Sequence, residues 1–171
     1  VMPPARVRPM ILILTINTVL LPIAAILFIK SRGLVQSIYL TSAKERRLGL
    51  VIVFVFYIIT YVLWRQLTLP HSFLAIFSAV LVTLLLVYIL VPYLKISMHT
   101  LAVGGMIGTF LGLFKAHGFI DIPALAIGFG LFGISGTARL ILHAHTAREI
   151  NYGVLTGIVV FYVFVGDSFY F

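Results

Sequence analysis

Long runs of apolar residues alternate with short polar linkers along most of the chain. A run of about 20 apolar residues is long enough to cross the hydrocarbon core of a bilayer as a helix. The sequence contains six candidate runs, at residues 10–29, 48–64, 72–92, 99–114, 122–138 and 150–166. The pattern therefore predicts an all-α fold, a polytopic membrane helix bundle with about six transmembrane helices.

Composition and charge agree with this prediction and exclude several classes of protein. Hydrophobic residues make up 62% of the chain and charged residues 9%, too apolar a mixture to be hidden in one soluble core. The absence of cysteine excludes a disulfide framework, a thiolate metal site and a cysteine nucleophile. The net charge of +8 lies on short linkers, where it more often sets topology and contacts anionic lipid headgroups than binds nucleic acid. We expect a single transmembrane domain over residues 1–171, with membrane lipids and no nucleic acid as partners, and the sequence leaves the oligomeric state open.

Glycines recur at a spacing of four in two of the runs, as Gly104, Gly108 and Gly112, then Gly153 and Gly157. The run between them adds Gly128, Gly130, Gly133 and Gly136. Small residues at such spacings let membrane helices approach closely. We therefore expect the last three helices to form a tight core, which holds the polar motifs at about residues 93–157, and the first three helices to be more peripheral.

The polar groups gather in three linkers. If six helices alternate in direction, the first, third and fifth linkers lie on the same face of the membrane. These linkers carry the segments 44–47, 95–99 and 139–149, which hold most of the ionisable residues of the chain. Ionisable groups are costly in or near hydrocarbon, so such a grouping is a hypothesis of a functional site.

The fifth linker places Arg139, His145 and Glu149 at intervals of six and four residues. This order resembles the third motif of the type 2 phosphatidic acid phosphatase family, Ser-Arg-x5-His-x3-Asp. Glu149 stands where the family has aspartate, and Ala138 where it has serine.

The third linker resembles the second motif of the same family, Pro-Ser-Gly-His. Ser97 and His99 match, while Ile96 and Met98 replace proline and glycine. The first motif, Lys-x6-Arg-Pro, is not present as such. The nearest cations are Lys44, Arg46 and Arg47 in the first linker and Lys95 beside the second motif, and the resemblance covers about residues 40–157.

The resemblance implies a divergent small bacterial member that hydrolyses a lipid phosphate or pyrophosphate through a phosphohistidine, without metal or other cofactor. His145 would be the nucleophile, Glu149 would fix its tautomer, and His99 would protonate the leaving oxygen. The expected phosphate-binding groups are Arg139, Ser97, Lys44, Arg47 and Lys95. The implied location is the bacterial inner membrane, with the active site facing the periplasm or exterior.

Three alternatives stay open at this point. The first is a non-catalytic relative that binds or moves anionic lipid. The second is a metal site, since two histidines and a carboxylate can form a facial triad, although the surrounding cations would repel a metal ion. The third is an unrelated multispan structural or transport protein, in which His99, Arg139 and His145 would not cluster.

Overall fold

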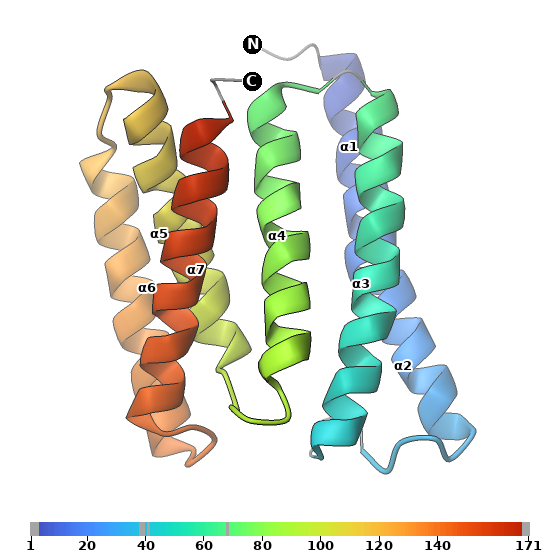
Figure 1. Ribbon diagram of the computed structural model, residues 1–171. Helices are drawn as coiled ribbons and strands as arrows, with labels where there is room; N and C mark the ends of the chain where they lie inside the picture. The colour runs from blue at the N-terminus through green and yellow to red at the C-terminus, as the bar shows by residue number, and fades with distance from the viewer. Residues whose placement is uncertain (1–3, 38–39, 41, 68, 169–171) are drawn as a thin grey trace. The chain divides into compact units, whose positions relative to one another are not determined.

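The computed structural model describes residues 4–37, 40, 42–67 and 69–168, and every regular element in these ranges is helical. The helices are α1 (Pro4–Thr15), η1 (Ile16–Leu20), α2 (Leu21–Ser31), α3 (Ala43–Gln66), α4 (His71–Leu90), α5 (Met98–His117), α6 (Ile122–Ile141) and α7 (Ala147–Asp167) (Figure 1). The first three are continuous, so six long helices correspond to the six predicted runs. The prediction of an all-α bundle is confirmed.

Five of these helices are long and apolar enough to cross a membrane: Val7–Ser31, Ala43–Gln66, His71–Leu90, Ile122–Ile141 and Ala147–Asp167. The chain is therefore an integral membrane protein. The remaining long helix, α5, carries four glycines in its interior and polar residues at both ends. It is lined with buried residues from Thr100 to Gly112, because α6 and α7 both pack against it.

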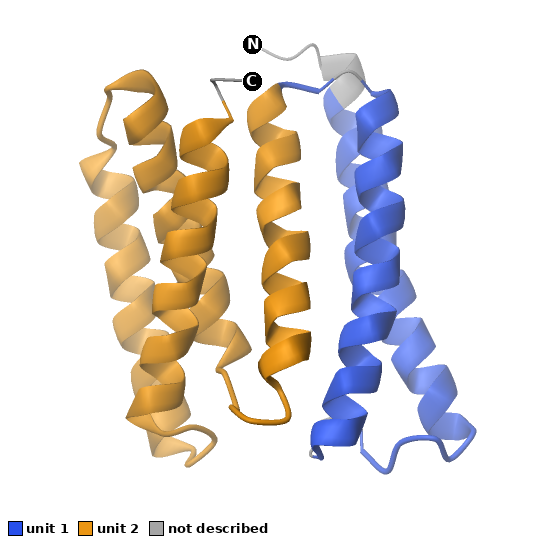
Figure 2. Cartoon of the chain, in the orientation of Figure 1, with its two compact units in different colours: residues 1–70 blue, residues 71–171 orange. Residues whose placement is uncertain are grey.

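The sequence predicts one domain, whereas the contacts divide the chain into two compact units, residues 1–70 and 71–171 (Figure 2). Unit 1 contains α1 to α3, and unit 2 contains α4 to α7. The motif residues of the third and fifth linkers all belong to unit 2, and the first linker belongs to unit 1.

The first long helix of unit 1 contains a π-helical turn, η1. The Leu21 N–H donates to the carbonyl of Ile16, five residues back. Pro22 follows and has no N–H to donate, so it cannot continue this series of hydrogen bonds. Asn17 itself is buried. Proline thus explains where the α-helical ladder is interrupted.

In unit 2, α5 and α7 pack with their backbones in direct contact. A Cβ atom on Gly104 or Gly108 would overlap the backbone of α7 at Val154 and Ile158. A Cβ atom on Gly157 would likewise overlap the backbone of α5 near Leu101. The two glycine series therefore face each other along a seam, as small residues do in membrane helix pairs.

Only some of the α6 glycines lie at contacts with other helices. Gly128 packs on the Ile107 side chain of α5, and Gly136 lies against the Ile150 side chain of α7. Gly130 and Gly133 have no neighbouring atom within 4 Å of a built Cβ. Close packing through glycine is therefore confirmed for α5 and α7 and holds for only part of α6.

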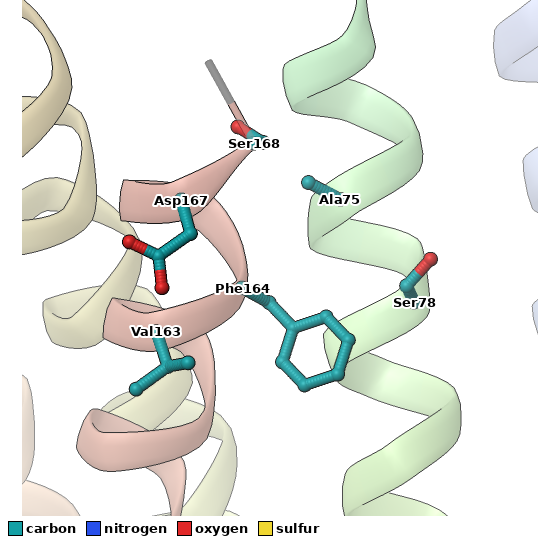
Figure 3. A pocket seen from close by; sticks show the side chains of 6 residues that line it. All are labelled: Ala75, Ser78, Val163, Phe164, Asp167 and Ser168. Atoms are coloured by element: carbon teal, nitrogen blue, oxygen red, sulfur yellow. The ribbon is translucent and has the colours of Figure 1, made fainter. Parts of the chain in front are cut away.

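The seam is closed at one end by an ion pair. Lys115, in the last turn of α5, pairs with Asp167 of α7, and its ammonium lies 5.4 Å from the centre of the Tyr162 ring. Beside it, a pocket of about 340 Å³ opens between α4 and α7, with the side chains in Figure 3 on its walls. The hydroxyls of Ser78 and Ser168 bond to carbonyls of their own helices. The pocket therefore offers mainly apolar surface.

Candidate functional site

The loop between α6 and α7 folds back onto the end of α6. The backbone N–H groups of Ala144 and His145 both point at the carbonyl oxygen of Arg139, at N–O distances of 3.1 and 3.4 Å. His143 supports this turn with a φ of +48°, and its side chain is exposed. The fold of the loop thus brings the backbone of His145 to that of Arg139.

Helix α7 begins with a capping box. The Glu149 N–H donates to the Thr146 hydroxyl at 3.4 Å, and the Thr146 N–H donates to Oε2 of Glu149 at 3.1 Å. The pattern Thr-x-x-Glu is a sequence signal for this arrangement. The motif comparison assigns Glu149 to the catalytic set alone and overlooks Thr146, which fixes the carboxylate where α7 starts.

The same carboxylate oxygen contacts the His145 ring. Nδ1 of His145 lies 2.9 Å from Oε2 of Glu149, and the two side chains are 14% and 19% exposed. A carboxylate accepts hydrogen bonds, so Nδ1 carries the proton and the lone pair of a neutral imidazole lies on Nε2. The contact expected from the spacing of four residues is present.

Backbone and hydroxyl bonds attach the start of α5 to the first turn of α7. The Ser97 N–H donates to the Glu149 carbonyl at 3.3 Å, and the Thr100 hydroxyl lies 3.1 Å from the Ile150 carbonyl. Thr100 is fully buried, and a Cβ on Gly153 would lie 2.5 Å from its Oγ1. Thr100 and Gly153 therefore determine where His99 lies along the axis of α7 relative to Glu149. Neither residue belongs to the family motifs.

Lys95 holds the loop of His145. Its ammonium donates to the carbonyl oxygen of Ala144 at 2.7 Å, across a sequence separation of 49 residues. This bond makes Lys95 a positioning residue for the loop. Its expected contact with phosphate stays a prediction. The ammonium group has two further protons that can make this contact.

Two buried side-chain atoms in the described part of unit 2 have no hydrogen-bond partner, Oγ of Ser97 and Nε of Arg139. A buried donor without a partner costs about 1–3 kcal/mol, so both atoms favour an additional ligand. Arg139 is partly exposed, whereas Ser97 is 0% exposed. Part of Arg139 is therefore open to solvent although its Nε is not, and the Ser97 hydroxyl is reached only from within the protein.

His99 lies in the first turn of α5, beside the loop and outside the five apolar spans. Partial burial of its ring lowers its pKa below the ordinary value for histidine, and electrostatic interactions with Arg139 and His145 lower that pKa further. Arg139 and His145 are therefore both close enough to His99 to act on it electrostatically. A negative ligand among them would relieve this repulsion.

The first-linker cations lie in unit 1. Lys44, Arg46 and Arg47 occupy the first turns of α3, which begins with a capping box between Ser42 and Glu45. Oε1 of Glu45 also accepts the Gln36 N–H at 2.7 Å, which folds the linker back on the helix. The predicted role of Lys44 and Arg47 in phosphate binding remains a prediction.

Metal-binding groups do not gather in the part of the chain that the structure describes. Among those residues no set of three or more His, Asp or Glu side chains is placed to hold a metal ion. The site instead combines a guanidinium with an unpartnered nitrogen, an imidazole oriented by a carboxylate, and a second imidazole. Such a set can bind an anion, attack it and transfer a proton.

The resemblance to the type 2 phosphatidic acid phosphatase family rests on the motif residues, chiefly Arg139, His145, Ser97 and His99. Comparisons of the chain with protein-family models, with curated proteins and with solved structures found no match. The function is therefore inferred from the chemistry of the site.

Proposed function

We propose that this protein is a membrane phosphatase that hydrolyses a lipid phosphate or pyrophosphate through a phosphohistidine. One observation carries the proposal: the Nδ1 atom of His145 is bonded to Glu149, which leaves Nε2 as a nucleophile. The backbone of the same loop is bonded to that of Arg139, whose Nε has no hydrogen-bond partner. A carboxylate–imidazole pair next to an anion-binding group is the arrangement that nucleophilic attack on phosphorus requires.

In the first step Nε2 of His145 attacks phosphorus and the bond between phosphorus and the lipid oxygen breaks. His99, protonated once the anion is bound, gives its proton to the departing oxygen and so releases an alcohol. Glu149 keeps the proton on Nδ1 and stabilises the positive charge that develops on the ring of His145. Arg139 offers paired N–H donors to the phosphoryl oxygens as charge builds on them.

In the second step a water molecule attacks the phosphorus of the phosphohistidine. His99, now neutral, takes a proton from that water as the P–N bond breaks. Inorganic phosphate leaves, Nε2 of His145 regains its lone pair, and the site returns to its starting protonation. Each proton released is taken up by His99, so the cycle needs no metal-bound water.

A lipid is the substrate that the position of the site favours. The linkers at 91–97 and 142–146 are short and follow directly on helices of unit 2, so the site lies at the end of the apolar helices. A lipid phosphate reaches such a site while its chains stay in hydrocarbon. We place the protein in a bacterial inner membrane with the site on the periplasmic side, and expect a preference over soluble esters of at least ~10-fold in kcat/KM.

The test uses the purified protein in detergent with phosphatidic acid, a polyprenyl phosphate and p-nitrophenyl phosphate. We expect release of phosphate from a lipid and, in acid-labile form, trapping of the phosphoryl group on the protein. His145→Ala should abolish both signals, whereas His143→Ala, which removes an exposed neighbour, should leave them nearly intact. Equal loss in both variants, or no turnover of any ester, would contradict the mechanism.

A non-catalytic relative that binds anionic lipid is the second candidate, and two observations favour it. The ammonium of Lys95 is bonded to a loop carbonyl, and the hydroxyl of Ser97 is sealed from solvent. Both groups are expected to contact phosphate in an active enzyme. Tight retention of a lipid phosphate without turnover would support this candidate.

A further inference from the structure

The pocket beside the ion pair of Lys115 and Asp167 is a candidate binding site that the proposed phosphatase does not use. Its described walls are Ala75 and Ser78 of α4 and Val163, Phe164, Asp167 and Ser168 of α7 (Figure 3). Asp167 lies about 27 Å farther along α7 than Glu149, at about 1.5 Å per residue. A ligand in this pocket therefore does not reach the catalytic groups, and its role is separate from theirs.

The pocket lies where two apolar helices end. Its walls belong to His71–Leu90 and to the end of Ala147–Asp167, which are both long and apolar enough to cross a membrane. Lipid headgroups meet hydrocarbon at the ends of such helices. Figure 3 shows the Phe164 ring projecting from α7 toward α4, with Ala75 on the facing side. The walls thus offer apolar surface to a lipid chain, and the oxygen atoms at the end of α7 are available to a headgroup.

The polar groups of the pocket residues can accept hydrogen bonds but have no proton to offer a ligand. The Ser78 hydroxyl donates to the Leu74 carbonyl at 2.9 Å, and the Ser168 hydroxyl donates to the Val165 carbonyl at 2.7 Å. A carboxylate only accepts, and none of the described lining residues is Lys, Arg or His. The pocket therefore suits a ligand that carries hydrogen-bond donors and a positive charge.

The ion pair leaves part of the Asp167 carboxylate available. Lys115 pairs with Oδ1, no other bond to Asp167 is made within the described part of the chain, and 42% of the Asp167 side chain is exposed. A primary ammonium can donate to the second oxygen and to Ser168, because it has three N–H groups. The Lys115 side chain is itself 35% exposed, so its positive charge can attract an anionic group on the same ligand. The pair therefore matches a zwitterion.

We propose that this pocket binds the ethanolamine headgroup of a phospholipid. The ammonium of the lipid is bonded to Asp167 and Ser168, its phosphate lies against Lys115, and one acyl chain runs along Phe164 and Ala75. A choline headgroup has the same charges but no N–H group, and a glycerol headgroup has hydroxyls but no positive charge. The pocket should therefore select phosphatidylethanolamine from both of these lipids.

The first test needs no variant. The purified full chain in detergent is mixed with phosphatidylethanolamine, its N-monomethyl and N,N-dimethyl derivatives, phosphatidylcholine and phosphatidylglycerol, all with the same acyl chains. Retention of each lipid is measured by native mass spectrometry. Because charge-assisted hydrogen bonds are the strong ones, we expect retention to fall with each methyl group and to be at least ~10-fold lower for phosphatidylcholine and phosphatidylglycerol.

Two pairs of variants then locate the site. Asp167→Asn should lower retention of phosphatidylethanolamine to that of phosphatidylcholine. Asp121→Asn is its matched control, because Asp121 is the N-cap of α6, lies outside the pocket, and asparagine caps a helix equally well. Ala75→Phe fills the pocket and should lower retention of phosphatidylethanolamine at least ~10-fold, whereas Ala126→Phe, exposed on α6, should not. Melting temperatures of the four variants verify that each is folded.

Several outcomes would overturn the proposal. Equal retention of phosphatidylethanolamine and phosphatidylcholine by the parent protein would remove the role of the N–H donors. A folded Asp167→Asn protein that keeps the preference would place the headgroup elsewhere. Dodecylamine that displaces phosphatidylethanolamine at equal concentration would assign the pocket to amines without phosphate. A lipid-free dimer that Ala75→Phe dissociates would show that a second copy of the chain fills the pocket.

Discussion

Oε2 of Glu149 lies 2.9 Å from Nδ1 of His145, and the same oxygen accepts the N–H of Thr146 that begins α7. One carboxylate oxygen therefore orients the ring of the candidate nucleophile and also caps the N-terminus of α7. The two roles are separable, because capping needs only an acceptor while the developing imidazolium needs a negative charge.

Glu149→Gln should leave the protein nearly as stable as the parent and slow turnover by at least ~10²-fold. A glutamine oxygen still accepts the Thr146 N–H, but it carries no charge to stabilise the imidazolium. Thr146→Ala is the reciprocal variant and should lower stability by about 1 kcal/mol while turnover falls much less. Thermal unfolding and phosphate release, measured on the same preparations, check both. A Glu149→Gln protein that is fully active would leave Glu149 with the capping role alone.

Arg139→Lys should reduce turnover of a lipid phosphate on the order of 10²-fold. An ammonium keeps the charge but cannot offer the paired, planar donors that fit a phosphoryl group. Arg148→Lys is the matched control, because Arg148 lies exposed on the first turn of α7. Initial rates at several substrate concentrations decide the matter, and equal effects of the two substitutions would argue against a specific contact from Arg139.

Exhaustive chelation should leave the activity unchanged, and vanadate should inhibit it. The described residues provide no group of three metal ligands, and vanadate mimics the five-coordinate phosphorus that attack by His145 would form. Activity assays with EDTA and with added Mg²⁺, Mn²⁺ or Zn²⁺ are the measurement. Loss with EDTA and recovery with one of these ions would restore the facial-triad alternative.

Anion binding should take up protons just below pH 6.5. Because the pKa of His99 is lowered in the free protein, its ring binds a proton less readily there than an ordinary histidine does, and a bound anion among His99, Arg139 and His145 raises that pKa again. Affinity should therefore rise as pH falls through this range. For folding of the free protein the sign is opposite. The unfolded chain binds the proton more readily than the folded protein, so the free energy of unfolding decreases as the pH is lowered from the ordinary pKa of histidine toward the lowered pKa of His99. Calorimetry with sulfate in two buffers of different ionisation enthalpy measures the uptake, and a His99→Gln variant that still takes up the same number of protons would refute this assignment.

Gly157→Ala should destabilise the bundle by about 1–3 kcal/mol, since its new methyl group meets the backbone of α5 and neither helix can give way without the other. Gly130→Ala is the control, because a methyl group there meets no atom within 4 Å and alanine favours a helix. Thermal unfolding in one detergent compares the two. Equal melting temperatures would show that the seam is not closely packed in the membrane protein as isolated.

The elements and contacts that depend on nearby residues could be predicted from the sequence. The apolar runs predict the positions of the long helices, because a membrane-spanning helix requires an apolar run of sufficient length. The contact between His145 and Glu149 follows from a spacing of four residues. The Thr146 cap is equally predictable from Thr-x-x-Glu, a signal that the family motif does not include.

Contacts between distant segments could not be predicted in this way. The bond from Lys95 to Ala144 and the bond from Thr100 to Ile150 depend on how far α5 is shifted along α7, which no local pattern specifies. The sealing of the Ser97 hydroxyl has the same origin, since it results from the packing of α5 on α7. The division into two units likewise depends on contacts across the chain, and it assigns Lys44 and Arg47 to unit 1 and the other motif residues to unit 2.

The backbone contact between α5 and α7 also determines which changes in chain length the site would tolerate. The glycine seam fixes the alignment of the two helices. The number of residues between His99 and Gly104 therefore determines where the His99 side chain lies. One residue inserted there would turn His99 by about 100° around the axis of α5 and shift it by about 1.5 Å, away from His145. An insertion beyond Gly112, on the far side of the seam, would leave His99 where it is. Relatives of this protein should therefore vary in length after α5 and keep the interval from His99 to the first glycine of the seam.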